Sequence, residues 1–293
     1  MKTRCFGLGL NPAARIFFGT HPYHPRMAPI RSPDSAAADL GRGALKWLAG
    51  WWRVIHFGAE LLVLALSPAS YRGENRAAMA RHVYLGTAPI LPWFTALSAL
   101  ISLVVIRIVI VTALSYGLTR YALEMVVRVL VLELIPLAAA MFVAIRITLP
   151  DAVEIAALRA RGDFDALKRQ GVDPLLREVL PRVAAGVFSV LMLAAVSCVV
   201  TLLLAYVSVY GFTTGGFAGY THTVGRIFGP GVTLIFALKT FFFAVAVAVM
   251  PIASVLYEPP RARTRTSAEL QGLVRMFLLL LLIEAASLVG NYY

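Results

Sequence analysis

Long uncharged stretches alternate with short, arginine-rich ones along most of the chain. Five of the uncharged stretches are close to the ~20 residues that a helix needs to cross a bilayer. They predict spans near 86–113, 124–148, 183–210, 231–256 and 270–290. The pattern therefore predicts an all-α integral membrane protein.

The N-terminal part departs from this pattern. Residues 1–40 are rich in Pro, Arg and Ala and lack an apolar core of signal-peptide length, so we expect a disordered basic tail. The remaining residues, 41–293, are then expected to form one membrane domain.

The segment 43–66 predicts an amphipathic helix, because Leu48, Trp52 and Ile55 fall on one helical face and Arg53 falls on another. With its three tryptophans, the segment is typical of a helix that lies in the membrane interface. A plain first span is the alternative, because the second half of the segment is largely apolar.

The distribution of arginine predicts the orientation of the spans. The connections 149–182 and 257–269 are rich in arginine, whereas 114–123 and 211–230 hold one arginine each. By the positive-inside rule the two basic connections are cytoplasmic. The N-terminus is then expected in the cytoplasm and the C-terminus outside it.

The outer connection 211–230 contains glycines spaced as in helix-packing motifs. We expect them to supply turns of a short hairpin loop rather than a packing face. They are Gly211, Gly215, Gly219, Gly225 and Gly229.

The composition agrees with a membrane protein and weighs against nucleic-acid binding. Hydrophobic residues make up 59% of the chain and charged residues 14%, while the net charge is +12. We interpret the excess charge as cytoplasmic loops that face anionic lipid. No segment outside the predicted spans is long enough to fold as a basic soluble domain. The two cysteines, Cys5 and Cys198, suggest neither a disulfide nor a metal site.

The sequence carries no recognisable catalytic motif. A phosphate-binding loop of the Gly-x-x-x-x-Gly-Lys-Ser/Thr type is absent, so the chain is not expected to hydrolyse nucleotide by that route. Metalloprotease and serine-hydrolase motifs are absent as well, and the five histidines are scattered without ligand spacing. We therefore predict no catalytic residue, no cofactor and no metal.

The cytoplasmic connection is the most informative segment. Residues 152–170 predict a helix, with Ile155 and Leu167 on an apolar stripe, and Asp173-Pro174 is expected to stop it. Such a helix is either a solvated connector or a coupling helix that docks on a separate ATPase.

Several short motifs in this region follow one another at fixed distances. They are Glu133-Leu134-Ile135-Pro136, Ala144-Ile145-Arg146, Glu154-Ile155, Gly171-Val172-Asp173-Pro174 and Pro181-Arg182-Val183-Ala184-Ala185-Gly186, with Lys239-Thr240 in the fourth span. Together they resemble the MlaE/YrbE permease family from about residue 43 to the C-terminus. The chain departs from the family where Ile135 replaces a glycine and Gly162 replaces an acidic residue.

The resemblance implies an interfacial helix, five spans and a cytoplasmic coupling helix in a permease of the bacterial inner membrane. It also implies a second permease copy, a cytoplasmic ABC ATPase and an MCE-type periplasmic lipid-binding protein. The expected function is non-enzymatic: movement of phospholipid between the inner and outer membranes. A membrane-embedded lipid-modifying enzyme or a non-ABC transporter subunit is the alternative.

Two sets of site residues follow. The residues expected to couple to the ATPase are Glu154, Arg159, Asp163, Leu167, Asp173, Pro174 and Arg182. The residues expected along the lipid path are Arg107, Glu133, Arg146 and Lys239.

Three of these residues carry a more specific expectation. Arg159, Asp163 and Leu167 recur at i, i+4 and i+8 and should share a helical face.

Glu133 lies deep in the second span, where a charge is expensive unless it is paired. It should therefore face the bundle interior, where it either lines the lipid path or is a protonated structural carboxyl, while Arg128 is expected to pair with Glu124 one turn away. Arg107 should lie near the outer interface, where it either snorkels or binds a lipid phosphate.

Overall fold

The computed structural model describes residues 33–67, 74–117, 119–257 and 265–292, which are almost entirely helical and include no strand. Five of their helical stretches are long and apolar enough to cross a membrane. They are Arg76–Ser115, Tyr121–Arg161, Leu175–Tyr210, Pro230–Tyr257 and Gly272–Asn291. The chain is thus an all-α membrane protein, as predicted.

The described residues belong to two compact units, one ending at Trp47 and one comprising Leu48–Tyr293. Helix α1 (Pro33–Leu66) contributes to both, and it begins inside the stretch predicted as a disordered tail. The rest of that predicted tail, 1–32, lies outside the described residues. The candidate functional site lies in the second unit.

In the second unit, α1 buries an aromatic and aliphatic stripe. Phe57 and Leu61 are almost fully buried in a cluster with residues of four other helical elements. Trp52 and Ile55, which the sequence pattern placed on the apolar face, remain exposed instead. The apolar surface of α1 is therefore wider than one stripe, and part of it is free to contact lipid or another chain.

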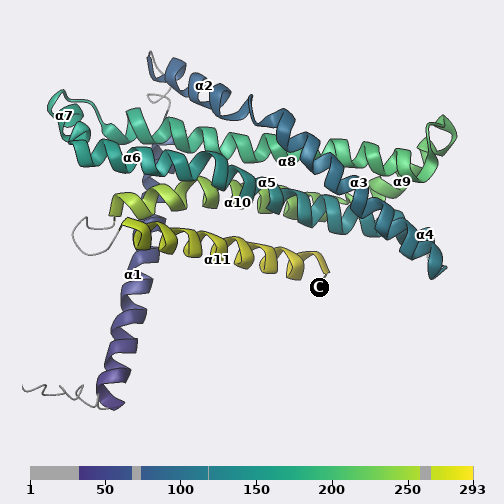
Figure 1. The fold of residues 1–293 in the computed structure, drawn as a ribbon, viewed down its shortest axis with the longest axis horizontal. Helices are drawn as coiled ribbons and strands as arrows, with labels where there is room; N and C mark the ends of the chain where they lie inside the picture. The colour runs from purple at the N-terminus through teal and green to yellow at the C-terminus, as the bar shows by residue number, and fades with distance from the viewer. Residues whose placement is uncertain (1–32, 68–73, 118, 258–264, 293) are drawn as a thin grey trace, which may run out of the picture. The chain divides into compact units, whose positions relative to one another are not determined.

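The first span is longer than predicted. It consists of α2 (Glu74–Thr87) and α3 (Leu91–Ser115), joined by a short turn. Both helices pack on α8 (Leu180–Tyr210), as Figure 1 shows. Two buried hydroxyl pairs fix these contacts: Thr87 with Ser189 at 2.7 Å, and Ser102 with Thr201 at 2.9 Å.

The second span is one continuous helical path with two π-helical insertions. It runs through α4 (Thr119–Met125), η2 (Val126–Leu134), α5 (Ile135–Val143), η3 (Ala144–Thr148) and α6 (Leu149–Arg161). The prediction that the span 124–148 and the coupling helix 152–170 are separate elements is wrong, because η3 continues directly into α6. Pro150 lies in the first turn of α6, where its missing N–H is tolerated, so it does not end the helix.

The predicted coupling helix is also broken. Gly162, with a φ of +82°, ends α6, and a second helix α7 (Asp163–Arg169) begins next to it. A left-handed φ of this kind favours glycine. The chain then enters η4 (Leu175–Val179) and α8, so the third span begins well before residue 183.

The connection between the third and fourth spans is not a simple hairpin loop. After Gly211 it forms a 3₁₀ turn, η5 (Thr214–Gly216), and the helix α9 (Phe217–Ile227). Gly219 and Gly225 lie inside α9, so the prediction that they supply turns is wrong for these two.

Tyr220 attaches α9 to α8. Its hydroxyl donates to the Leu202 carbonyl at 2.7 Å, and its ring meets Tyr206 edge to face. Burial, with a smaller effect from Tyr210, raises the pKa of Tyr220 to about 12, so the phenol stays a hydrogen-bond donor.

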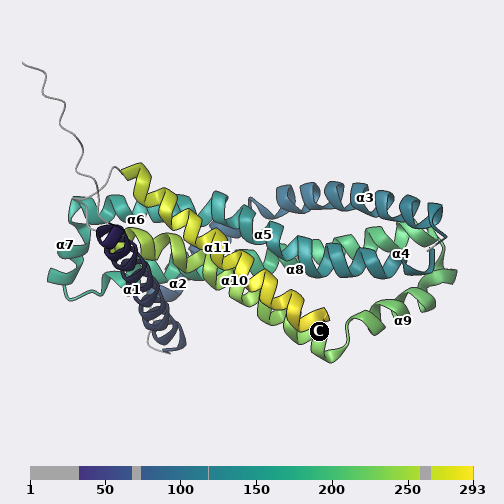
Figure 2. The same cartoon turned by 90° about the horizontal axis from the view of Figure 1, so that it is seen from below.

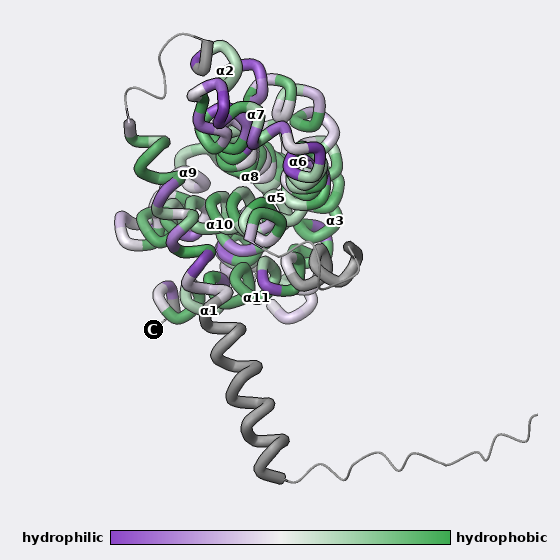
Figure 3. The backbone as a smooth tube through the Cα atoms, turned by 90° about the vertical axis from the view of Figure 1, so that its left-hand side faces the viewer, coloured by the Kyte–Doolittle hydropathy of each residue, from purple (hydrophilic) through white to green (hydrophobic). Residues whose placement is uncertain are grey.

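The last two spans are α10 (Pro230–Tyr257) and α11 (Arg265–Tyr292), which lie side by side in Figure 2. Within the second unit, α7 and α9 lie at opposite ends of the helices (Figure 1), which we call the α7 end and the α9 end. Figure 3, viewed toward the α7 end, shows hydrophilic residues on α2, α6 and α7.

Candidate functional site

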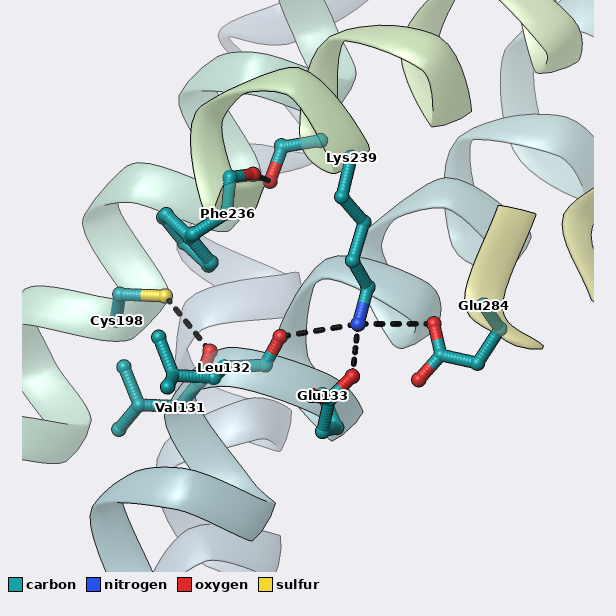
Figure 4. A network of polar contacts seen from close by, with 8 residues as sticks. Val131, Leu132, Glu133, Cys198, Phe236, Lys239 and Glu284 are labelled. Carbon is teal, nitrogen blue, oxygen red and sulfur yellow. Dashed lines mark hydrogen bonds and ion pairs between the residues drawn. The ribbon is translucent and has the colours of Figure 1, made fainter. Parts of the chain in front are cut away.

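An ionic cluster lies inside the apolar part of the bundle, centred on Lys239 of α10 (Figure 4). Its ammonium group pairs with Glu133 of η2 and, at 2.9 Å, with Glu284 of α11. It also donates to the Leu132 carbonyl at 3.2 Å. Lys239 is 3% exposed, so all of these contacts are shielded from solvent.

The proline of the Glu133-Leu134-Ile135-Pro136 motif explains why a backbone carbonyl is available here. In an α-helix the Leu132 carbonyl would accept from the N–H of residue 136, and a proline there has none. The π-helical segment η2 precedes Pro136, as expected where the regular hydrogen-bond ladder is interrupted. The lysine of a neighbouring helix thus satisfies part of the interrupted ladder.

The cluster contains two carboxyl groups for one ammonium group. Glu133 Oε1 is buried and accepts from no described N–H or O–H group, but the Glu284 carboxyl lies within hydrogen-bond reach of Glu133, so the two can share a proton. An unpaired acceptor in such a place is costly unless a proton, a water or a ligand donor meets it. The two carboxyl groups can therefore hold a shared proton, or bind another hydrogen-bond donor or a cation in its place.

Glu133 faces the interior, with a side chain 12% exposed, and Arg128 pairs with Glu124 at 3.0 Å, as predicted. The structure brings two of the four predicted lipid-path residues, Glu133 and Lys239, into direct contact. Sequence reasoning missed Glu284, although an acidic residue within the fifth apolar span was a usable signal.

The other two predicted lipid-path residues lie apart from the cluster. Arg107 is exposed on α3 and forms no hydrogen bond or ion pair within the described part of the chain. Arg146, on η3, lines a groove between the second span and the α2–α3 junction.

A second ionic cluster joins three elements near the α7 end. The Arg182 guanidinium, 5% exposed, pairs with Glu178 at 2.8 Å and with Glu154 of α6 at 3.2 Å. It also donates to the Glu178 carbonyl at 2.6 Å. Two of the predicted coupling residues, Glu154 and Arg182, thus tie α6 to the start of the third span.

Arg159 contacts α10 rather than presenting a free charge. Its guanidinium donates to the carbonyls of Val255, at 3.3 Å, and of Leu256, while Arg53 of α1 donates to the Tyr257 carbonyl at 3.4 Å. These are the last carbonyls of α10, which lack partners within the helix. Two arginines therefore cap the end of the fourth span.

The face predicted for Arg159, Asp163 and Leu167 does not exist as one surface, because Gly162 breaks the helix between them. Asp163 pairs with Arg161 at 3.4 Å, and Leu167 is half-buried.

The remaining two predicted coupling residues shape the local backbone. Asp173 accepts a hydrogen bond from the Leu175 N–H at 3.0 Å, and Pro174 directly precedes η4. Both residues therefore begin the next helical segment, a local role that capping side chains commonly have.

Among the described residues, no group of His, Cys, Asp or Glu is arranged to hold a metal ion. The arrangement that is present, apolar spans around buried ion pairs with polar helices at one end, defines a multi-pass membrane protein.

Comparison with known families agrees with this class. Residues 79–289 match the family described as Permease MlaE, so the chain belongs to that family and is a transporter component. The family resemblance deduced from the sequence motifs is thereby confirmed. A search of curated proteins found no match to the chain.

Proposed function

We propose that this chain is the permease subunit of an ABC-type system that moves phospholipid between the inner and outer membranes of a bacterium. The match to the permease family over residues 79–289 carries this proposal. A separate cytoplasmic ATPase supplies the energy, since the sequence has no phosphate-binding loop. An MCE-type periplasmic protein and a second permease copy complete the proposed assembly.

The proposed orientation puts the α7 end in the cytoplasm and the α9 end in the periplasm. It rests on charge, because the arginine-rich connection 149–182 includes α7, whereas 211–230, which includes α9, holds Arg226 as its one arginine. The N-terminus is then cytoplasmic and the C-terminus periplasmic.

The α6–α7 segment is the proposed docking element for the ATPase. It ends the second span without a flexible linker, and Arg182 and Arg159 connect it to α8 and to α10. A movement of α6 is therefore passed to three spans at once. Leu167, on the polar α7, is the proposed apolar anchor of the contact.

The cluster of Glu133, Lys239 and Glu284 is the proposed site at which the lipid headgroup makes polar contacts on its path through the permease. Its contacts join η2, α10 and α11, so a rearrangement of these elements changes the partners of the ammonium group. A donor group of a phospholipid headgroup would replace the proton shared by Glu133 and Glu284 and bind the buried Glu133 Oε1.

The proposal is tested by purifying the tagged chain from native membranes and reconstituting it in vesicles. We expect a soluble ATPase with a phosphate-binding loop to co-purify, and ATP to drive transfer of labelled phospholipid to an MCE-type acceptor. An ATPase whose phosphate-loop lysine is replaced is the control. Full transfer with no ATPase present would contradict the proposal.

A further inference from the structure

A groove of about 860 Å³ lies between the α2–α3 junction and the η3–α6 stretch. One wall is apolar and includes Trp93, Leu97 and Leu100 of α3. The other wall includes Phe142 and Arg146. The groove is distinct from the Lys239 cluster, none of whose residues line it.

Two charged side chains of the second span line this groove, Arg146 and Asp151. Neither forms a hydrogen bond or ion pair with another described residue. Arg182 attracts Asp151 electrostatically, but its guanidinium is engaged by Glu154 and Glu178. The two groove charges thus remain available to a ligand.

The two charges lie at different depths. Asp151 follows Arg146 by five positions, which at helical rise is about 7.5 Å, and it is the nearer to the α7 end. On the opposite wall the order is the same: Leu85 and Pro89 lie toward the α7 end, and Leu100 lies deeper. From the α7 end inward, the groove therefore presents an anion, a cation and then an apolar wall.

This order matches the groups of an amine-bearing phospholipid in the cytoplasmic leaflet: ammonium outermost, phosphate next, acyl chains deepest. We propose that the groove binds such a lipid, with Arg146 on the phosphate, Asp151 on the ammonium group and an acyl chain along Leu97 and Leu100. A guanidinium suits a phosphate because it can donate two parallel hydrogen bonds. Trp93, 77% exposed, also lines the groove, and indole rings commonly contact lipid headgroups.

The inference rests on the proposed function for its biological sense, since a lipid held here would be waiting for transport. The inference itself states that the groove prefers one class of lipid, and this preference can be measured without transport. The other occupant to consider is a second copy of the chain, whose side chains would cover the same apolar wall.

The test uses Trp93 as a fluorescent probe of the groove. In a variant whose other tryptophans, Trp47, Trp51 and Trp52, are replaced by Phe, the protein is placed in phosphatidylcholine vesicles. A small fraction of dibrominated phosphatidylethanolamine or phosphatidylglycerol is then added, and quenching of Trp93 reports which lipid occupies the groove. We expect phosphatidylethanolamine to be enriched about three- to tenfold over its bulk fraction, and more than phosphatidylglycerol.

Two variants separate the roles of the charges. Arg146→Gln should reduce quenching by both lipids to the bulk level, and Asp151→Asn should abolish the difference between them. Arg177→Gln, an exposed arginine that does not line the groove, is the matched control and should behave like the parent. If the Phe substitutions disturb folding, the chain with all four tryptophans is used instead. Native mass spectrometry then compares how much of each lipid stays bound with and without Arg146→Gln.

Quenching that follows the bulk lipid fraction in the parent protein would overturn the inference. So would protection of Trp93 from every brominated lipid together with a Leu97→Cys disulfide between two copies, which would show that a second chain fills the groove. Enrichment without ATP-driven transfer would contradict the proposed function alone, and transfer without enrichment would contradict this inference alone.

Discussion

At the scale of single residues, the Lys239 cluster shows how a membrane protein keeps charges inside its bundle. A buried charge is tolerated when it is paired and hydrogen-bonded, and Lys239 reaches two carboxylates and one carbonyl. Glu133→Gln removes one of two carboxylates and leaves an ammonium–carboxylate pair, whereas Lys239→Met leaves two carboxylates together.

We therefore predict that Lys239→Met destabilises the protein by about 3–5 kcal/mol, and Glu133→Gln by clearly less. Thermal unfolding in detergent measures both effects. The triple variant that also replaces Glu133 and Glu284 by Gln should recover part of the loss, because it leaves no unpaired charge. Equal losses for Lys239→Met and Glu133→Gln would show that charge balance is not what stabilises the cluster. Normal stability of Glu133→Gln with lost transport would assign Glu133 to the lipid path.

At the scale of elements, prolines and π-helical segments explain how the second and third spans continue past Pro136, Pro150 and Pro181. Pro136, Pro150 and Pro181 each follow a π-helical segment by two residues. A π-helical turn shifts the hydrogen-bond partner by one residue and so accommodates a missing N–H. At these three positions the proline marks a change of helical register and not the end of a helix.

The connection between α6 and α10 gives one prediction at this scale. Arg159→Gln removes the guanidinium that caps the Val255 and Leu256 carbonyls, at a cost of about 1 kcal/mol or less because the side chain is exposed. We expect the ATPase to stay bound while less lipid is transferred per ATP hydrolysed. Arg161→Gln, on the same helix but paired with Asp163 and no other described residue, is the control. If Arg159→Gln leaves the amount of lipid transferred per ATP hydrolysed unchanged, this contact does not take part in coupling.

A second prediction at this scale concerns the α7 helix. Leu167→Asp should leave the permease inserted and dimeric but release the ATPase, because burying an unpaired carboxylate in the contact is costly. Lys168→Asp, at the exposed neighbouring position, should have a smaller effect. Co-purification of the ATPase in pull-down experiments measures both. If the Leu167→Asp protein retains its ATPase and lipid-stimulated hydrolysis, the docking surface lies elsewhere.

At the scale of the whole molecule, the orientation in the membrane can be tested with single cysteines in a chain whose Cys5 and Cys198 are replaced. Gln170→Cys follows α7, and Thr214→Cys lies before α9, both at exposed positions. In intact spheroplasts, a membrane-impermeant maleimide should label residue 214 readily and residue 170 only after the membrane is opened. The reverse pattern would place the α7 end in the periplasm and invalidate the positive-inside argument.

The sequence by itself determined the class of the protein and the rough position of the five spans, because crossing a bilayer demands a local run of about 20 apolar residues. The pairing of Arg128 with Glu124 was predictable for the same reason, since it is set by one helical turn. Burial of Glu133 also followed from the cost of an unpaired charge in that position.

Only the tertiary structure decided which helices meet and which faces they turn to one another. Lys239 and Glu133 are 106 residues apart, and their contact depends on the rotation and depth of two separate helices, which no local pattern specifies. The partners of Arg159 were also not predictable from the sequence. They are the last carbonyls of α10, and because every residue has a backbone carbonyl, the sequence does not show which one accepts a hydrogen bond. Gly162 changed the coupling segment from one helix into two, because a single left-handed residue redirects the chain after it.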